Sequence, residues 1–384
     1  MARVDSEEYL EGLAQRLREA FPQALDGEGR VNLKELLPEQ LQEFCAILGE
    51  SSYRAGQLLR WIYVQRVTDF QAMSNISARL RARLERLAVL SQLQLLTPKH
   101  SRQDTSKFLF GLPDGQMVEC VKMRYLEHLG PERVAVCISS QVGCAMGCQF
   151  CASGQAGLVR NLKAWEIVDQ ALQIQRQLDA KGERVANVVF MGIGEPFNNF
   201  DNVLRAIQLL NCGEGFGVGM RHIALSTCGI VPGIERLTEL AYPLKLAISL
   251  HATTDELRNR LMPVNRRWNL EALLGACRRY QERVGRRITF EYVMLEGVND
   301  SPEDAERLVR LLHGIRSLVN LIPWNAVDHP TFKRSSPERV RKFQERVQRL
   351  GLRCTLRREK GSDIDAACGQ LRLRQAAQVE PVEA

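Results

Sequence analysis

Two hydrophobic patterns divide the chain into a helical beginning and a longer part in which strands and helices alternate. In about the first hundred residues, apolar side chains recur every three or four positions, which is typical of amphipathic helices. The segments with this spacing are 33–50, 51–65 and 77–90. Polar residues at 98–106 predict a boundary, and 108–125 predict a β-hairpin with Asp114-Gly115 at its turn.

After Arg133, short apolar runs alternate with segments of helical spacing. The predicted strands are 134–141, 185–194, 221–229, 244–252, 287–295 and 318–325, and the predicted helices are 164–178, 200–210, 234–241, 270–284, 305–315 and 336–350. This alternation predicts an α/β fold with a parallel sheet. Because consecutive units of this kind connect with the same hand, we expect a partial TIM-like (β/α)6 barrel. A last strand is predicted at 352–358.

These patterns predict four regions along the chain. Residues 1–100 are expected to form a small N-terminal helical accessory domain, and 101–133 a β-hairpin extension. Residues 134–372 are expected to form the barrel core with a C-terminal loop. We expect the tail at 373–384 to be disordered.

The composition is that of a globular protein. Hydrophobic residues make up 45% of the 384 residues and charged residues 25%, which excludes a disordered or fibrous protein. No apolar run approaches the roughly 18 residues that a membrane-spanning helix needs. The first ten residues lack the apolar region of a secretory signal. We therefore expect a cytoplasmic protein that does not bind a membrane.

Positive charge is concentrated towards the C-terminal end. The whole chain has a net charge of +7, whereas residues 1–100 hold 13 basic and 13 acidic residues. Residues 333–360 hold 11 basic and 3 acidic residues, a net charge of +8. Such a segment suits a polyanion such as a nucleic acid. Charge alone would be explained equally well by a solvated helix face.

Three of the eleven cysteines lie within eight residues: Cys144, Cys148 and Cys151. An odd number of cysteines without a signal peptide argues against a secreted disulfide scaffold. Clustered cysteines in a reducing compartment indicate metal, iron–sulfur or redox chemistry. The cluster follows the first strand of the barrel, at the face that carries the active site in barrel enzymes.

Three thiolates at this spacing suit three corners of a [4Fe–4S] cluster. The fourth iron would then be free to chelate the amino and carboxylate groups of S-adenosylmethionine. A zinc knuckle would need a second pair of ligands nearby, and no such pair follows. A thioredoxin-like pair, Cys148 and Cys151, would leave Cys144 without a role.

At these cysteines the chain resembles the RlmN/Cfr family of RNA methyltransferases, a branch of the radical S-adenosylmethionine superfamily. The resemblance covers about residues 34–371, and its stretches are CISSQVGCAMGCQFCASG (137–154), FMGIGEPFNN (190–199), LSTCGIVP (225–232), AISLHA (247–252), EYVMLEGVND (291–300), NLIPWN (320–325) and GSDIDAACGQL (361–371). The GEP and IPWN motifs are similar to RlmN rather than to Cfr. The resemblance therefore favours methylation at C2 of adenine over C8.

The resemblance implies three catalytic residues. Cys368 accepts a methyl group from one S-adenosylmethionine, and a second S-adenosylmethionine supplies a 5′-deoxyadenosyl radical that activates this methyl group. After the carbon adds to adenine, Glu119 removes the proton at the modified carbon. Cys137 then attacks the sulfur of Cys368, which forms a disulfide and releases methyladenine. Without the resemblance, Cys137 would be a small buried strand residue and Glu119 a solvated one.

The resemblance also implies the residues that bind S-adenosylmethionine. They all lie at the C-terminal ends of predicted strands of the barrel, and they are Gly194, Glu195, Ser226, Ser249, Leu250, His251 and Asn325. A lone serine or asparagine at such a place would more often cap a turn. The recurrence at successive strand ends favours a binding site. The GIGEP motif is not a dinucleotide fingerprint, because it lacks the third glycine.

The partners implied are 23S rRNA at the peptidyl-transferase centre and tRNA at the adenosine beside the anticodon. A flavodoxin- or ferredoxin-like electron donor and a disulfide reductant are also implied, and we expect a monomer. Phe332, Phe343 and the basic segment 333–360 are candidates for RNA contacts, as are the arginines of 77–87.

Two other functions fit parts of the pattern. An RNA-binding protein with a structural cluster would need neither Cys137 nor Cys368. A radical enzyme that acts on a small molecule or a protein would not need the basic segment. Four cysteines are interpreted as structural, namely Cys45, Cys212, Cys277 and Cys354, and no role is assigned to Cys120 and Cys228.

Overall fold

The structure is a computed structural model that describes residues 5–102, 104–125, 133–155, 157–325, 332–357, 361–366 and 369–371. Cys368 and the predicted tail at 373–384 lie outside these residues. Contacts between residues divide the chain into two compact units. Unit 1 comprises residues 1–93, 163–182 and 204–218, and unit 2 comprises the rest.

Unit 1 is helical, as the spacing in the first hundred residues predicts. Its helices are α1 (Glu7–Ala20), α2 (Pro38–Ile47), α3 (Tyr53–Leu59), α4 (Ala78–Leu87), α6 (Ala164–Asp179) and the C-terminal part of α7 (Phe200–Asn211). The hydroxyl groups of Ser6 and Ser77 cap α1 and α4 by accepting from backbone N–H groups of the first turn. A short parallel pair, β1 (Val31–Asn32) and β2 (Ala88–Val89), joins the two ends of the N-terminal segment.

A fully buried ion pair lies inside unit 1. Lys34 Nζ is 2.7 Å from Asp169 Oδ1, and neither side chain is exposed. The other carboxylate oxygen of Asp169 accepts from the backbone N–H of Leu93 at 2.8 Å. Because a buried charge is costly unless it is paired, this contact fixes α6 to the N-terminal segment of the unit.

Unit 2 is built on one ten-stranded sheet, which contains all six strands predicted after Arg133. The order of strands is β14-β13-β12-β11-β10-β9-β6-β5-β4-β3. The parallel part runs from β6 to β14, and its strands are β6 (Arg133–Cys137), β9 (Val185–Phe190), β10 (Ile223–Thr227), β11 (Lys245–Ser249), β12 (Ile288–Met294), β13 (Ser317–Pro323) and β14 (Cys354–Leu356). The prediction of an α/β partial barrel is confirmed, and the strand predicted at 352–358 extends its parallel sheet.

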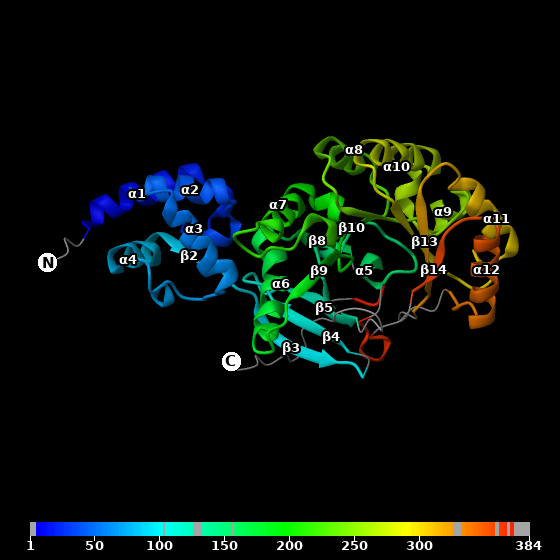
Figure 1. Ribbon diagram of the computed structural model, residues 1–384, viewed down its shortest axis with the longest axis horizontal. Helices are drawn as coiled ribbons and strands as arrows, with labels where there is room; N and C mark the ends of the chain where they lie inside the picture. Colours follow the sequence, from blue (N-terminus) through cyan, green and yellow to red (C-terminus); the bar gives the residue numbers. More distant parts are fainter. Residues whose placement is uncertain are drawn as a thin grey trace. The chain divides into compact units, whose positions relative to one another are not determined.

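Helices follow the parallel strands of unit 2 (Figure 1). They are α8 (Val231–Leu240), α9 (Asp255–Leu261), α10 (Leu270–Val284), α11 (Pro302–Leu311) and α12 (Pro337–Arg349). Helix α10 begins at an Asn269 side-chain cap and ends at Gly285, which adopts a left-handed conformation. Helix α9 was not among the predicted helices, because its seven residues are too few for a clear helical period.

The antiparallel end of the sheet is the predicted hairpin with one more strand. Strands β4 (Thr105–Gly111) and β5 (Met117–Tyr125) form the hairpin, and β5 pairs with β6. The additional strand, β3 (Gln94–His100), pairs with β4 and takes in the start of the polar stretch 98–106. Polar residues are tolerated there because β3 is an edge strand.

A separate antiparallel pair lies next to β6 in the sequence. Strand β7 (Gln141–Cys144) pairs with β8 (Gly157–Asn161), and the short helix α5 (Ala152–Gln155) lies between them. This pair encloses the loop that carries the clustered cysteines.

Within the described part of the chain, every helix is too short or too polar to cross a membrane.

Candidate active site

A pocket of about 180 Å³ lies where the parallel strands of unit 2 end. Residues predicted to bind S-adenosylmethionine line it from the ends of four parallel strands: Gly194 and Glu195 after β9, Ser226 on β10, Ser249 and His251 at β11, and Asn325 after β13. All three clustered cysteines line the same pocket. The structure therefore brings together in one cavity nine of the thirteen residues that the sequence indicated.

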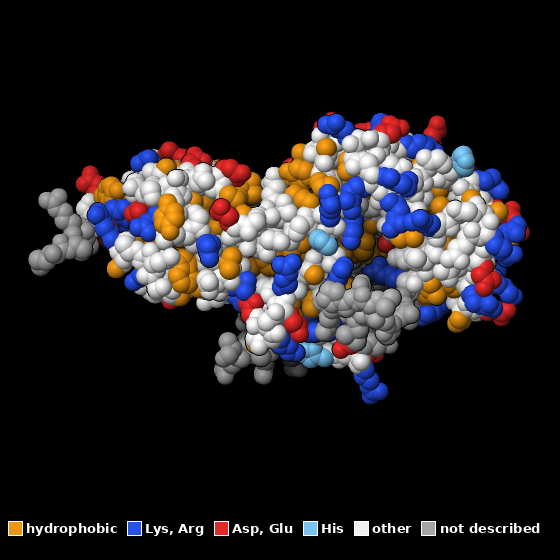
Figure 2. Space-filling model, in the orientation of Figure 1, with side chains coloured by type: hydrophobic (Ala, Val, Ile, Leu, Met, Phe, Trp, Pro, Cys, Tyr) orange, Lys and Arg blue, Asp and Glu red, His pale blue; other side chains and the backbone are white. Residues whose placement is uncertain are grey.

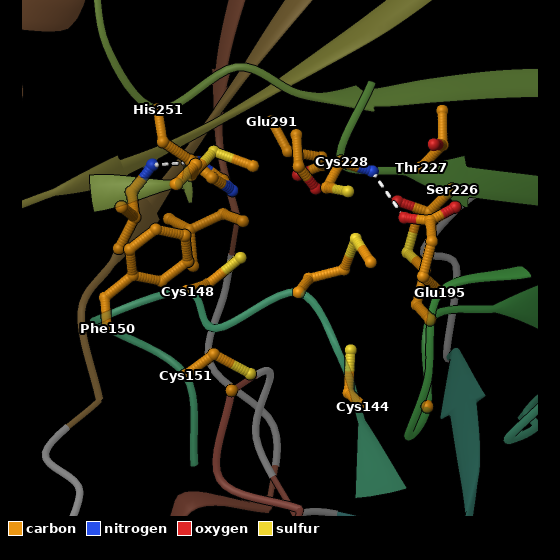
Figure 3. Close-up of a pocket in the computed structure, with 18 of the residues that line it drawn as sticks. Cys144, Cys148, Phe150, Cys151, Glu195, Ser226, Thr227, Cys228, His251 and Glu291 are labelled. Atoms are coloured by element: carbon orange, nitrogen blue, oxygen red, sulfur yellow. Dashed lines mark hydrogen bonds between the residues drawn. The ribbon is translucent and has the colours of Figure 1, made fainter. Parts of the chain in front are cut away.

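The clustered cysteines come from one loop, and their side chains point into the cavity (Figure 3). Cys144 ends β7, while Cys148 and Cys151 follow in the loop. The loop closes on itself through a hydrogen bond from Cys151 N to Cys148 O at 3.2 Å. Two left-handed glycines allow this path: Gly143, where a Cβ would lie 2.0 Å from Gly157 O, and Gly147.

Burial controls the protonation of the cysteine thiols. It raises the pKa of Cys144 to about 11 and the pKa of Cys148 well above its usual value, and the neighbouring thiols add to both increases. These thiols therefore stay protonated unless a cation is bound that favours the thiolates.

The donor set fits an iron–sulfur cluster. Among the described residues, no three His, Cys, Asp or Glu side chains are grouped closely enough to hold one metal ion. A four-iron cube does not need such a group, because each thiolate binds a different iron. Three soft sulfur donors that face one cavity match three corners of the cube and leave one corner for a small molecule.

Glu195 is held at the pocket wall by backbone hydrogen bonds. Its Oε2 accepts from Cys228 N at 2.7 Å, and its Oε1 accepts from Phe197 N at 3.0 Å. Burial raises the pKa of Glu195, and the hydrogen bonds from Cys228 and Phe197 oppose this increase. The preceding residue, Gly194, has φ +104°, and a Cβ there would lie 2.6 Å from Gln141 Cβ. Only glycine lets the chain turn this closely past β7.

His251 supports the cysteine loop from the opposite wall. Its φ of 60° is left-handed, and its Nδ1 accepts from Val293 N at 3.0 Å, which leaves the ring proton on Nε2. The ring packs edge to face on Phe150, with centroids 4.7 Å apart. Burial, with a smaller contribution from Arg258, lowers the pKa of His251 to about 3. The imidazole is therefore neutral at physiological pH.

Leu250, which precedes His251, does not line the pocket. Its side chain is fully buried, and its backbone N–H donates to Glu291 O at 3.0 Å. The left-handed turn at His251 brings the imidazole of His251, rather than the side chain of Leu250, to the cavity.

Several residues that line the pocket were assigned no role from the sequence. Glu291, on β12, is buried, and its Oε2 accepts from Asn320 Nδ2 at 2.9 Å. Burial raises the pKa of Glu291, and Arg357, 3.9 Å away, partly offsets this effect. A single acid in the apolar strand 288–294 is the signal that could have identified it. Phe150 and Trp324 also line the pocket and lie in the matching stretches 137–154 and 320–325, whereas Arg357 lines it from outside all of these stretches.

Comparison with known proteins agrees with this geometry. Residues 31–90 match the family model of the ribosomal RNA large subunit methyltransferase N-terminal domain, and residues 138–312 match the radical SAM superfamily. A probable dual-specificity RNA methyltransferase RlmN of Symbiobacterium thermophilum is 50% identical over 361 residues, which are 93% of this chain and 96% of that protein. The chain belongs to the RlmN family of radical SAM methyltransferases.

Two further relatives extend the comparison. The dual-specificity RNA methyltransferase RlmN of Syntrophotalea carbinolica is 46% identical over 349 residues, with 91% of each chain covered. The crystal structure of a radical SAM methyltransferase from Sphaerobacter thermophilus superposes with a TM-score of 0.84 at 44% identity. It covers 89% of this chain and 99% of that one.

Cys137 lies outside the pocket of this RlmN-family chain, in a buried apolar cluster. The cluster contains Ala366 and Leu371, which flank Cys368 in the sequence at distances of two and three residues. The C-terminal segment is also tied to the cysteine loop, because Ala152 N donates to Gly369 O at 2.9 Å and Gly369 lines the pocket. Cys368 itself lies outside the described residues.

Glu119 is the other predicted catalytic residue that lies outside the pocket. It is on β5, 5% exposed, and its Oε1 is 3.0 Å from Lys107 Nζ on the neighbouring strand β4. The same ammonium group donates to Asp365 O at 3.1 Å. Lys107 thus connects the predicted base to the segment that precedes Cys368.

The basic segment 333–360 is partly neutralised by ion pairs. On α12, Arg339 pairs with Asp300 at 3.1 Å and Arg346 pairs with Glu306. Both acids lie outside the segment, so the net charge of +8 overstates its local field. Figure 2 shows basic and acidic side chains intermingled on the face around α12.

The two phenylalanines suggested as RNA contacts have other partners. Phe343 is 3% exposed and stacks on Tyr292, with centroids 5.6 Å apart, so it belongs to the core. The expectation that it contacts RNA is therefore wrong. Phe332 packs edge to face on Trp324, with centroids 6.3 Å apart.

Three of the four arginines of α4 are ion-paired as well. Arg79 and Arg83 share Asp5, and Arg86 pairs with Glu7. These acids offset only part of the positive charge of the helix, because Arg79 and Arg83 share one carboxylate and, among the described residues, Arg81 donates only to neutral groups.

Proposed function

We propose that this chain is an adenosine methyltransferase that modifies C2 of the adenine ring in 23S rRNA, at the peptidyl-transferase centre, and in tRNA, at the adenosine beside the anticodon. Its relatives carry names that describe dual-specificity RNA methyltransferases, which supports two RNA substrates. The GEP motif at 194–196 and the IPWN motif at 322–325 support C2 rather than C8.

The chemistry of the target explains why a radical enzyme is needed. Carbon C2 of adenine is electron-poor and carries no acidic proton, so it does not attack a methyl sulfonium as a nucleophile. A bound [4Fe–4S] cluster would supply the electron that makes S-adenosylmethionine a radical source. Cys144, Cys148 and Cys151 would hold this cluster, and Glu195, Ser226, Ser249 and Asn325 would position the cofactor at its open iron.

Cys368 would carry the methyl group, and Cys137 would release the product. The observation that carries this proposal is the buried cluster that joins Cys137 to Ala366 and Leu371. Since these residues flank Cys368 in the sequence, the cluster supports a disulfide between Cys137 and Cys368 as the resolving step. One S-adenosylmethionine would methylate Cys368 and a second would be consumed as the radical source.

Glu119 would accept the proton from the modified carbon. A carboxylate beside an ammonium group is held in its ionised form, which is the form that a base requires. The hydrogen bond from Lys107 to Asp365 supports a position of Glu119 close to the methyl-carrying loop. Turnover would further require a flavodoxin- or ferredoxin-like electron donor and a reductant for the disulfide.

The most informative test is anaerobic reconstitution with iron, sulfide and S-adenosylmethionine, followed by incubation with 23S rRNA fragments or tRNA. Nucleoside mass spectrometry is expected to detect 2-methyladenosine in both RNAs. Detection of 8-methyladenosine would contradict the C2 assignment. A fully loaded enzyme that modifies neither RNA would favour an RNA-binding protein with a structural cluster.

A further inference from the structure

Arg258, on α9, is a fully buried cation whose hydrogen-bond acceptors are all neutral. Its Nη2 donates to Cys228 O at 2.6 Å and to Ser249 O at 3.1 Å. Its Nε donates to Leu250 O at 3.1 Å, and its Nη1 donates to Asn265 Oδ1 at 2.8 Å. These contacts satisfy the hydrogen-bonding groups of the guanidinium but do not balance its charge.

The nearby acid Asp255 does not pair with Arg258. Its Oδ1 accepts from Asn265 Nδ2 at 2.8 Å and from Leu270 N at 2.9 Å. No ion pair of Arg258 is found among the described residues. A buried charge that lacks a partner costs several kcal/mol, so a site of this kind indicates an anion that the protein is built to receive.

The guanidinium lies directly behind the wall of the pocket. Two of the residues whose carbonyls it binds, Cys228 and Ser249, line the pocket at the ends of β10 and β11. The helix that carries Arg258 also contacts the loop of the clustered cysteines, because Gln149 N donates to Leu261 O, at the end of α9, at 3.0 Å. Arg258 therefore lies between the pocket wall and a helix that is hydrogen-bonded to this loop.

We propose that Arg258 is the resident counter-charge of the cluster site and raises the reduction potential of the cluster held by Cys144, Cys148 and Cys151. A cluster with three thiolate ligands becomes more negative when it takes up an electron. A buried cation stabilises the reduced form more than the oxidised one, and salt screens buried charges little. This inference rests on the cluster assignment in the proposed function, but it is independent of the RNA substrate.

The test is a redox titration of the reconstituted protein, followed by electron paramagnetic resonance without S-adenosylmethionine or RNA. We expect Arg258→Gln to make the one-electron reduction at least tenfold less favourable, which lowers the midpoint potential by at least 59 mV. Arg258→Lys keeps the charge and should stay within threefold of the wild type. Equal midpoint potentials for the wild type, Arg258→Gln and Arg258→Lys would overturn the proposal.

A second pair of variants leaves every hydrogen bond of Arg258 in place. Cys277, on α10, is fully buried and lies outside the pocket lining. Burial raises the pKa of the Cys277 thiol to about 12, and the charge of Arg258 opposes this increase. The carboxylate introduced by Cys277→Asp would balance the positive charge of Arg258. The side chain introduced by Cys277→Asn has the same shape as aspartate but carries no charge. The Asp variant should be at least threefold harder to reduce than the Asn variant, and equal potentials would contradict the proposal.

Arg307→Gln provides the matched control. Arg307 already pairs with Asp304 and does not line the pocket, so its loss should leave the midpoint potential unchanged. A shift as large as that of Arg258→Gln would mean that the effect is not specific to the site. Failure of the proposed function would appear differently. The midpoint potentials of the wild type and the variants would differ as predicted here, but the protein would make no 2-methyladenosine.

Discussion

The ammonium group of Lys107 lies 3.0 Å from the carboxylate of Glu119, and the two side chains are 11% and 7% exposed. They come from neighbouring antiparallel strands, β4 and β5, where Leu109 is directly opposite Glu119. Lys107 also binds the backbone carbonyl of Asp365. One side chain therefore orients the proposed base and anchors the C-terminal segment.

Lys107→Met is expected to slow release of the methylated RNA. Without the ammonium group, Glu119 loses an ion-pair partner that orients its carboxylate at 3.0 Å. General bases contribute about 10²–10⁴-fold, and we expect the loss of this support to slow release about tenfold. The measurement is the amount of protein covalently linked to RNA, followed on denaturing gels at fixed times.

Two variants control this prediction. Lys107→Arg keeps the positive charge and should release RNA at close to the wild-type rate. Glu119→Gln should trap the covalent adduct more strongly than Lys107→Met. A Lys107→Met enzyme with wild-type release, beside a Glu119→Gln enzyme that traps the adduct, would show that Lys107 has only a structural role.

Cys137→Ala is expected to accumulate a covalent protein–RNA adduct, because no thiol remains to attack the sulfur of Cys368. The matched control is Cys120→Ala, since Cys120 is also buried, on the neighbouring strand β5. The control should turn over normally. If both variants trap RNA, the cause is a disturbed sheet, and if neither does, Cys137 is not the resolving residue.

Cys148→Ala is expected to abolish the brown colour of the reconstituted protein and to remove most of its iron. Cys354→Ala is the appropriate control, because Cys354 is a buried cysteine on β14 that does not line the pocket. Iron analysis and absorption spectra decide the outcome. An unchanged spectrum in Cys148→Ala would contradict its role as a cluster ligand.

The order of the elements could be predicted from the sequence because each has its own local period. The site residues that follow strands could also be predicted, since a break in an apolar run marks the end of a strand at the active face. Glu195, His251 and Asn325 are examples, and all three line the pocket.

Residues within strands and contacts between distant segments could not be predicted in this way. Glu291 points into the pocket from the middle of β12, where alternation alone does not distinguish the cavity from the core. The association of Cys137 with Ala366 and Leu371 joins segments more than 200 residues apart, so no local pattern indicates it. Lys107 was missed for the same reason, because its partner Asp365 is distant in the sequence.

The buried ion pair of unit 1 leads to a prediction about stability. Asp169→Ala would leave the Lys34 ammonium group buried without a partner, and we expect this to destabilise unit 1 by about 3–5 kcal/mol. Removing both charges in Lys34→Met with Asp169→Leu should cost less than Asp169→Ala alone, because no unpaired charge remains. Hydrogen exchange of peptides from residues 5–93 and 163–182, measured by mass spectrometry, reports on this unit separately. Both variants lose the hydrogen bond from Leu93 N to Asp169, so they differ in the unpaired charge of Lys34. A double variant that exchanges faster than Asp169→Ala would contradict the electrostatic explanation.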